Sequence, residues 1–471
     1  MSIASEIARL QQAKADLKTA INAKGQSIDD ETLDEYAGFV DAIEVGGGGG
    51  TGDYLVRFFD YDGTVLKEEY VDSGEAATAP TSPDRTAEGL TFVEWNNAYS
   101  NITSDMDIGA TYETTDGKTH IFIALNANTG NDILLYLNKS DGSTLSIDWG
   151  DGSAVATFTN SGNFNTGTHT YASAGNYEIE LWISSGSGTY GFGNDSSGII
   201  QTTAQKYTVY KIYIGEKVDL SKNGSLRELY CLRNVVIPYL GNTFGNSFFS
   251  RCYMLEAVVI PNGVTDINTS FLWEAKTVYM VSLPSGLLQI KQNAFESCWG
   301  LQKIVIPNSV SFVGSTAFRY CYILEKVIIP TTTPITFYNT TFSYCYNIDL
   351  QFTNNIEITG TSVFNRSYRL KNLTIPTATT VIEAFTFQTN YSLKTVTFHS
   401  GVTKLKASCF ADCSQLHSIY FLNHTSVPTL DNISAFSGVS AMLKIFVPSA
   451  LEAVWKLATN WSTYEDYIVG V

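Results

Sequence analysis

Apolar residues recur with one fixed spacing along the second half of the chain. When Phe318 is taken as position zero, Cys321 follows at +3, Leu324 at +6, Val327 at +9 and Ile329 at +11, and a proline stands at +12. The same frame recurs at intervals of 22 to 26 residues from Leu226, Phe249, Phe271, Phe295, Phe342, Phe364, Phe387, Phe410 and Phe436. Such a period predicts a solenoid, in which each turn buries its apolar side only against its neighbours. The copy at Phe271 fits the frame poorly, and the last copy is weak, as expected of a cap.

The first 45 residues have helical periodicity instead. Apolar residues follow a heptad-like spacing, broken once by a lysine, at Ile3, Ile7, Leu10, Leu17 and Ile21. Three heptads are too short to be stable alone, so we expect residues 1–45 to anchor the chain to partner proteins or to oligomerise, as a homotrimer. The alternative is a helical hairpin packed on its own protein. The glycine-rich residues 46–52 then predict a flexible linker.

Residues 53–115 alternate between apolar and polar side chains, which predicts strands, with Asp62 and Gly63 in a hairpin turn. The segment contains "GTVL", then an F-x-x-W strand from Phe92 to Trp95 and a closing I-x-A-x-Y from Ile108 to Tyr112. It resembles the Listeria–Bacteroides repeat, or internalin B-repeat, module. The resemblance implies a β-grasp-like spacer or adhesive unit without a catalytic role.

Residues 118–205 predict a second β domain. The stretches "SIDWGDGS" (146–153) and "HTYASAGNYEIELWI" (169–183) resemble the strands of a PKD-type β-sandwich, with Trp149 as a core residue. A Ser/Gly-rich stretch that follows departs from that pattern, and it is either a tip loop or a domain boundary.

The repeat region, residues 212–471, carries the most specific resemblance. The phrase "NAFESCWGLQKIVIPNSVSFVG" is similar to the BspA-like, or treponemal, leucine-rich repeat. The resemblance implies one short strand per turn, such as "KIVIP", and a segment that returns along another side. The fold class expected for the whole chain is therefore mainly β and multidomain, with a helical segment at its start.

Cysteines occupy position +3 in five copies: Cys252, Cys298, Cys321, Cys345 and Cys413. Other copies have Leu229, Ser367 or Asn390 at this position. We therefore expect the cysteines to pack in the core and not to bind a metal. The cysteines number seven, which rules out complete pairing in disulfides. A zinc site is an alternative for Cys409, Cys413, His417 and His424, but Cys413 already holds a core position. We expect no metal and no cofactor.

Position +4 is aromatic in most copies: Tyr253, Trp299, Tyr322, Tyr346, Tyr368 and Tyr391. Further aromatic or basic residues flank it at +1 and +2, among them Arg319, Tyr320 and Tyr344. The BspA-like family usually has a small polar residue at +4, so this chain departs from the pattern. The stripe predicts a surface that binds a glycan or protein of a host cell. Alternatively, the rings shield the edges of the turns or contact another subunit.

Composition and motifs narrow the function. The net charge of −17 argues against nucleic acid or an anionic membrane as a partner, and no apolar run is long enough to insert into a membrane. We find no catalytic constellation and expect no enzyme. The start of the chain lacks a signal peptide, so we expect export inside a virus particle. The favoured function is a phage virion fibre, bound to other virion proteins through its N-terminus and to the host through its solenoid. A BspA-type bacterial cell-surface adhesin is the alternative.

Overall fold

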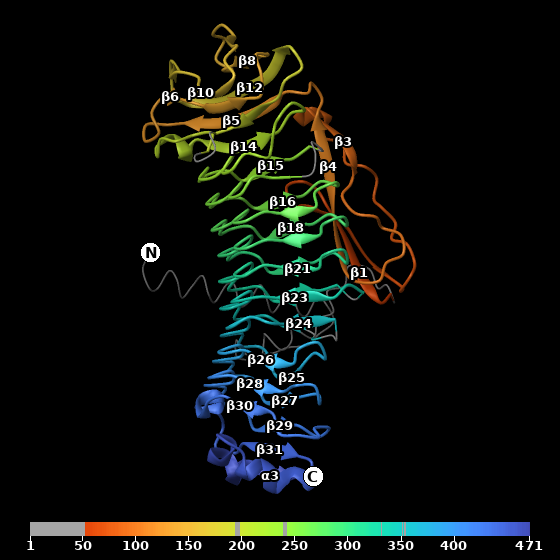
Figure 1. The fold of residues 1–471 in the computed structure, drawn as a ribbon. Coiled ribbons are helices and arrows are strands. Elements are labelled where there is room, and N and C mark those ends of the chain that lie inside the picture. Colours follow the sequence, from red (N-terminus) through yellow and green to blue (C-terminus); the bar gives the residue numbers. More distant parts are fainter. Residues whose placement is uncertain (1–51, 194–197, 239–242, 331, 351, 353–354) are drawn as a thin grey trace, which may run out of the picture.

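The protein is an elongated rod with a β-sandwich at one end and a small sheet along one side (Figure 1). The computed structural model describes residues 52–193, 198–238, 243–330, 332–350, 352 and 355–471. The predicted helix 1–45, its seam residues from Ile3 to Ile21 and the linker glycines 46–50 lie outside these ranges. No helix within the described residues is long and apolar enough to cross a membrane.

The small sheet, called the module below, is formed by residues 53–115. Its strands are β1 (Tyr54–Phe59), β2 (Val65–Val71), β3 (Leu90–Trp95) and β4 (Met106–Thr114), in the order β2-β1-β4-β3. Strands β1 and β4 are parallel, whereas β2 and β3 pair antiparallel to their neighbours. The predicted hairpin turn closes through a hydrogen bond of 2.8 Å from Asp60 N to Thr64 O. Gly63 adopts a φ of 87°, which favours glycine.

Within the described residues, the β-sandwich is built from nine strands. They are β5 (Thr119–Leu125), β6 (Asp132–Ile133), β7 (Tyr136–Lys139), β8 (Thr144–Asp148), β9 (Ala156–Phe158), β10 (Gly162–Asn165), β11 (His169–Thr170), β12 (Gly175–Ser185) and β13 (Tyr190–Phe192). Trp149 is buried at its centre, where its ring stacks on His169 at 4.5 Å. Its larger sheet does not end with the sandwich, because β5 pairs with β14 (Val209–Tyr213), and β14 pairs with the first solenoid strand, β15 (Asn234–Val236). The sandwich and the solenoid therefore share one hydrophobic core.

Two rows of short parallel strands run along the solenoid. The first row, at positions +8 to +10 of each turn, comprises β15, β16 (Ala257–Val259), β18 (Met280–Ser282), β20 (Lys303–Val305), β22 (Lys326–Ile328), β25 (Asn372–Thr374), β27 (Thr395–Thr397), β29 (Ser418–Tyr420) and β31 (Lys444–Val447). The second row comprises β17 (Asp266–Ile267), β19 (Gln289–Ile290), β21 (Phe312–Val313), β23 (Ile335–Phe337), β24 (Ile356–Ile358), β26 (Val381–Ile382), β28 (Lys404–Leu405) and β30 (Thr429–Leu430). Most of the described turns thus follow the sequence prediction of a strand and a returning segment.

A third side of the solenoid has no strands but has its own ladder of hydrogen bonds. Residues at −2 and +2 adopt positive φ, as Thr316 (59°) and Tyr320 (63°) show. The amides of Thr316, Phe318 and Tyr320 donate to carbonyl oxygens of the next turn at 2.9 to 3.0 Å. The residues with positive φ orient every second amide toward the next turn of the solenoid. The backbone polar groups are therefore hydrogen-bonded without extended strands.

The positions of positive φ correct the frame of one turn. Ser270 and Glu274, both at 58°, flank Leu272, so the third turn begins at Leu272 and not at Phe271. With this shift Ala275 occupies +3 and Val278 occupies +6, and both are fully buried. The turn is therefore regular, and its degeneracy in the sequence was an error of register.

Stacked phenylalanines fill the core at position zero. Their ring centroids lie 5.1 to 5.8 Å apart with interplanar angles of 5° to 11°, along Phe295, Phe318, Phe342, Phe364, Phe387, Phe410 and Phe436. The end of the stack is covered by α3 (Glu452–Leu457), a 3-10 helix (Trp461–Tyr467) and β32 (Ile468–Gly470). Trp455 and Trp461, both fully buried, pack there on the last turns.

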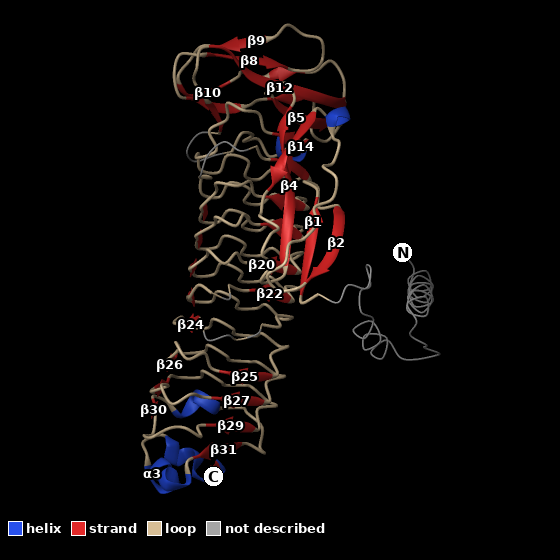
Figure 2. Cartoon of the chain, turned by 90° about the vertical axis from the view of Figure 1, so that its right-hand side faces the viewer, coloured by secondary structure: helices blue, strands red, loops and turns tan. Residues whose placement is uncertain are grey.

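The module packs along the first strand row of the solenoid and is not a separate, undocked domain. Figure 2 shows β1, β2 and β4 beside the turns that carry β20 and β22. Gly109 lies so close to Val259 that a Cβ atom would stand 2.4 Å from its methyl carbon. Asp107 is buried and accepts from Lys303 at 3.1 Å, and Asn97 Nδ2 donates to Leu283 O at 2.8 Å.

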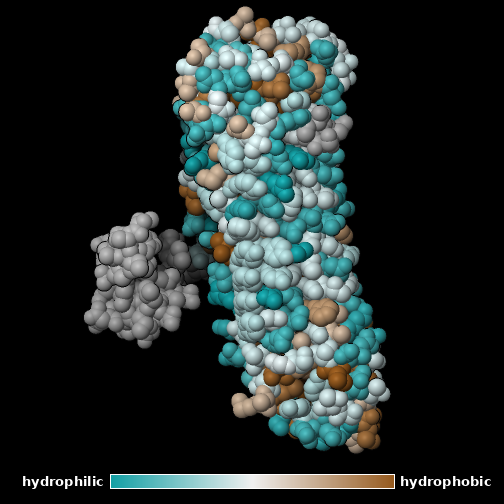
Figure 3. Space-filling model, turned by 90° about the vertical axis from the view of Figure 1, so that its left-hand side faces the viewer, coloured by the Kyte–Doolittle hydropathy of each residue, from teal (hydrophilic) through white to brown (hydrophobic). Residues whose placement is uncertain are grey.

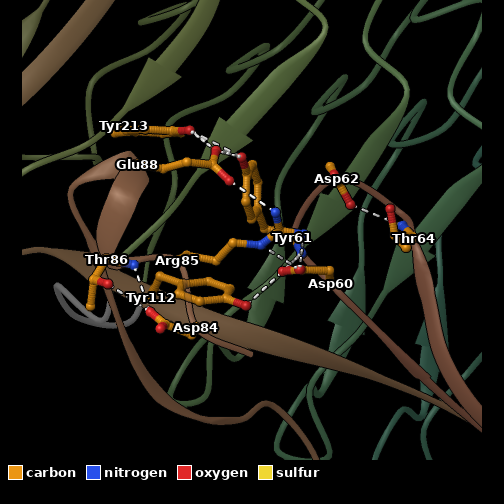
Figure 4. A network of polar contacts seen from close by, with 10 residues as sticks. All are labelled: Asp60, Tyr61, Asp62, Thr64, Asp84, Arg85, Thr86, Glu88, Tyr112 and Tyr213. Carbon is orange, nitrogen blue, oxygen red and sulfur yellow. Dashed lines mark hydrogen bonds and ion pairs between the residues drawn. The ribbon is translucent and has the colours of Figure 1, made fainter. Parts of the chain in front are cut away.

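A partly buried polar network fixes the end of the module nearest the sandwich (Figure 4). Tyr61 and Tyr213 both donate to Glu88 at 2.7 Å, and Arg85 pairs with Glu88 and with the fully buried Asp60. Burial alone would raise the pKa of Glu88, but the two tyrosine hydroxyls and the Arg85 charge outweigh it and lower that pKa. Every charge in the network has a partner of opposite sign or a hydroxyl donor, as a buried charge requires. The module is thereby held as one body with the solenoid.

Candidate binding surface on the solenoid

The cysteines at +3 are buried and none is in a disulfide. Each thiol lies within hydrogen-bond distance of the carbonyl that starts the preceding turn; Cys321 Sγ, for example, is 3.2 Å from Phe295 O. Asn390 occupies the same position and donates through Nδ2 to Phe364 O at 2.9 Å. Position +3 is therefore a buried packing position, where cysteine or asparagine adds a donor for that carbonyl.

The four residues of the zinc alternative are not gathered into one site. Cys409 and Cys413 are buried in the core, His417 contacts Ser418 Oγ at 2.9 Å, and His424 Nε2 contacts Val402 O at 3.2 Å. Within the described residues, the one group that could hold a metal is His120, Glu178 and Glu180, on the sandwich.

The members of that group on the sandwich already have partners within the protein. The two ring nitrogens of His120 contact Glu178 at 2.8 Å and Asp116 at 3.0 Å, while Lys118 pairs with Glu180. Both imidazole nitrogens are therefore already in contact with carboxylate oxygens of the protein. We interpret the group as a surface ion-pair cluster.

The side chains at +4, together with Tyr207 before the first turn, form a continuous stack, called the aromatic ladder below. It comprises Tyr207, Tyr230, Tyr253, Lys276, Trp299, Tyr322, Tyr346, Tyr368 and Tyr391. Neighbouring ring centroids lie 4.9 to 5.7 Å apart, and Tyr346 and Tyr368 are parallel to within 1°. The structure thus brings together all six aromatic residues that the sequence singled out at +4.

Three members of the ladder were not among the predicted residues. Tyr230 stands at +4 from Leu226, so the repeat frame itself could have found it. Lys276 reaches +4 only after the third turn is moved to Leu272. Its Nζ lies 4.9 Å from the Tyr253 ring centroid and 4.3 Å from the Trp299 ring centroid. The ammonium group therefore takes the place of an aromatic ring between Tyr253 and Trp299. Tyr207 precedes the first turn, outside the repeat frame.

The predicted flanking residues extend the ladder sideways. Tyr320 and Tyr344 pack together at 4.9 Å, and each also contacts the ladder, at Tyr322 and Tyr346 respectively. The Arg319 guanidinium lies over the Tyr320 ring at 4.3 Å. The surface is therefore broadest around the turns that start at Phe318 and Phe342.

The ladder presents ring edges and hydroxyl groups to solvent, because the ring faces cover one another. Most of its rings are half-buried, and the most exposed are Tyr207, Trp299 and Tyr391, at 50%, 40% and 46%. Burial raises the pKa of Tyr322 and of Tyr346, so both phenols are neutral at physiological pH and can donate hydrogen bonds. Such a surface suits ligands rich in hydroxyl or anionic oxygen.

No other segment of the described residues covers this side of the solenoid (Figure 3). Figure 3 looks onto the long side that faces away from the module, where side chains of intermediate hydropathy form a column along the rod. A cleft of about 850 Å³ lies between the module and the solenoid. Its basic residues Arg57, Lys303 and Lys326 are already ion-paired with Asp107 and Asp105. We therefore assign a structural role to the charges in that cleft.

The repeats match a known family. Six copies of the BspA type leucine rich repeat region match over residues 222–349 and 335–458, which together make up half of the chain. The chain belongs to the BspA type leucine-rich repeat family. No curated protein sequence matches the chain. The resemblances of residues 53–115 and 118–205 to the two other module types stay predictions.

Solved structures similar to this BspA type chain include proteins from several bacteria. A leucine rich cell surface protein from Faecalibacterium prausnitzii A2-165 is 19% identical, with a TM-score of 0.31, over 50% of this chain and 76% of that one. A leucine-rich repeat protein from Bacteroides ovatus is also 19% identical, with a TM-score of 0.29, over 55% and 87%. The pneumococcal vaccine antigen PcpA is 14% identical, with a TM-score of 0.34, over 55% and 76%.

Proposed function

We propose that the protein is a non-enzymatic recognition protein, which binds a glycan or protein on a host cell surface through the aromatic ladder. The observation that carries the proposal is the unbroken stack from Tyr207 to Tyr391 on the open side of a rigid rod. The rings are held by their neighbours, so a ligand meets them without a large cost in side-chain entropy. Tyrosine and tryptophan also supply more binding energy per residue than most side chains.

The second part of the proposal concerns attachment. The heptad-like spacing of residues 1–45 supports a segment that anchors the protein to a phage particle as a homotrimeric fibre, with the solenoid directed at the host. A bacterial cell-surface adhesin is the second candidate, favoured by the membership in the BspA type family. Mass photometry of the full chain tests the trimer, and a monomer at micromolar concentration would refute it.

Binding of labelled protein to whole cells and to a glycan array tests the role of the ladder. The double variant Tyr322→Ser/Tyr346→Ser removes two adjacent rings, and we expect it to reduce binding at least tenfold. Tyr338→Ser is the matched control, because Tyr338 is also a tyrosine of the solenoid with 36% exposure but lies outside the ladder. Equal binding by the double variant and the wild type would exclude the ladder as the contact surface.

A further inference from the structure

One arginine of the described residues differs from the rest in its charge environment. Eight arginines are described, and seven of them form an ion pair with a carboxylate: Arg57, Arg85, Arg227, Arg233, Arg251, Arg319 and Arg369. Arg366 forms no ion pair with any carboxylate of the described residues. In a chain with 46 acidic and 29 basic residues, an arginine without an acidic partner is unexpected.

The position of Arg366 in its turn makes the contrast sharper. Arg366 occupies +2, and Arg251 occupies +2 in an earlier turn, where Glu228 and Glu274 lie 3.4 and 3.2 Å away. In the turns on either side of Arg366, position +2 is held by Tyr344 and Thr389, neither of which carries a carboxylate. Neutral side chains therefore stand where the earlier turns supply a carboxylate.

Tyrosines surround Arg366 instead. Its guanidinium lies 5.1 Å from the Tyr344 ring centroid and interacts electrostatically with the Tyr368 phenol. The ladder continues on both sides of Tyr368, with Tyr346 at 4.9 Å and Tyr391 at 5.1 Å. The result is a guanidinium set among phenol groups, on the open side of the rod.

From this arrangement we propose that the ligand of the ladder is a polyhydroxylated polymer with anionic oxygen groups, and that Arg366 binds its carboxylate or phosphate. This rests on the proposed function. A guanidinium offers a planar fork of donors that matches both oxyanions, and such charge-assisted hydrogen bonds are stronger than neutral ones. The tyrosine hydroxyls beside it serve the hydroxyl groups of the same ligand.

An anionic ligand would account for the lack of a carboxylate partner for Arg366 among the described residues of a strongly acidic protein. A glutamate at +2 of either neighbouring turn, in place of Tyr344 or Thr389, would pair with Arg366 and repel an anionic ligand. The cation–π contact with Tyr344 holds the guanidinium but leaves its charge unneutralised.

Isothermal titration calorimetry with defined polymers tests the proposal. The probes are oligogalacturonate, its methyl ester, and poly(glycerol phosphate); the methyl ester keeps the sugar and removes the charge. We expect the wild type to bind at least one of the two anionic probes, and to bind the ester at least tenfold more weakly than oligogalacturonate if the carboxylate is the preferred group. Arg366→Gln should weaken anion binding about 10- to 100-fold, and Arg366→Lys should recover part of it.

The control variant is Arg369→Gln, three residues further along, where the arginine pairs with Glu325. It should bind the anionic probes like the wild type. Equal binding by Arg366→Gln and the wild type would overturn the inference, and so would the absence of binding to both anionic probes. Loss of whole-cell binding in Tyr322→Ser/Tyr346→Ser together with unchanged binding in Arg366→Gln would leave the proposed function in place and remove only the role of Arg366.

Discussion

The thiol of Cys321 donates a hydrogen bond of 3.2 Å to the carbonyl oxygen of Phe295, the residue that begins the preceding turn. The same carbonyl also accepts from Cys298 N within its own turn. One buried acceptor thus joins two consecutive turns. The thiol at +3 is therefore both a filling group and a cross-link between turns.

The first prediction concerns this contact. Cys321→Ala should lower the free energy of unfolding by about 1–2 kcal/mol, because it removes a buried sulfur atom and a hydrogen-bond donor. Urea unfolding followed by circular dichroism measures the change. Cys231→Ala, at a half-buried cysteine, is the control and should change stability by less than about 0.5 kcal/mol. Equal effects of the two substitutions would show that position +3 has no special role.

A second prediction concerns thiol reactivity. Six of the seven cysteines are buried, and Cys231 alone is half-buried. A thiol reagent at pH 8 should label one cysteine per native chain quickly and all seven after unfolding, because reaction needs an accessible thiolate. Mass spectrometry identifies the labelled residue. Fast labelling of Cys321 or Cys345 in the native protein would contradict the buried position at +3.

The third prediction is the pH dependence of stability. Burial raises the pKa of Cys252 and of Cys413 to about 12, and it raises the pKa of Cys298, Cys321, Cys345 and Cys409 as well. Since the unfolded thiols ionise near pH 9, the unfolded state gains charge first as the pH rises. Stability should be constant below about pH 8.5 and should fall above about pH 9, by up to about 1.4 kcal/mol per pH unit for each buried thiol.

Urea unfolding between pH 7 and pH 10.5 checks this dependence. Cys252→Ala should make the fall above pH 9 less steep, even though it lowers stability at pH 7. A wild-type free energy of unfolding that does not change up to pH 10.5 would be inconsistent with buried, protonated thiols.

The fourth prediction concerns the docked module. Gly109→Ala places a Cβ atom 2.4 Å from a methyl carbon of Val259, so we expect a loss of about 1–3 kcal/mol and faster proteolysis of the module. Val259→Ala in the same chain removes the clashing methyl groups and should restore part of the loss. Gly142→Ala is the control, because no atom lies within 4 Å of its added methyl group. Additive effects of Gly109→Ala and Val259→Ala would show that the two residues do not touch.

The fifth prediction concerns Lys276. Lys276→Ala removes two cation–π contacts and should lower stability by about 1 kcal/mol, whereas Lys276→Tyr continues the stack and should be close to neutral. Thermal unfolding of the two variants and the wild type distinguishes these outcomes. A loss in Lys276→Tyr as large as that in Lys276→Ala would show that the site requires the charge and not a stacked group.

The repeat could be found from the sequence because its determinants are local. Each turn carries its own apolar residues at +3, +6 and +9, and the turns stack on copies of themselves. The prediction was wrong at Phe271, because an aromatic residue was taken as position zero where Leu272 holds it. Phe271 is also fully buried, so hydrophobicity alone could not choose between the two, and the left-handed backbone at Ser270 and Glu274 decides.

The docking of the module could not be read from the sequence. It depends on the fit of Gly109 to Val259 and on the pairing of Asp107 with Lys303, which lies 196 residues away along the chain. Likewise, it takes the stacking of neighbouring turns in space to show that no carboxylate of the described residues pairs with Arg366. The repeat pattern reveals the residues that all turns share, whereas these features depend on residues that occur in single turns.

The module also has a mechanical consequence for the rod. Through Asp105 and Asp107 it contacts the turns that carry Lys326 and Lys303, and through Gly109 it reaches the turn of Val259, so it braces the half of the solenoid next to the sandwich. Among the described residues, the turns beyond Asp349 are joined to other turns of the solenoid, as by the Arg369–Glu325 ion pair, and to the terminal cap. Under a bending load, most of the deformation would therefore occur in the half of the solenoid that the module does not contact. Arg366 lies in that half, so bending would displace its guanidinium.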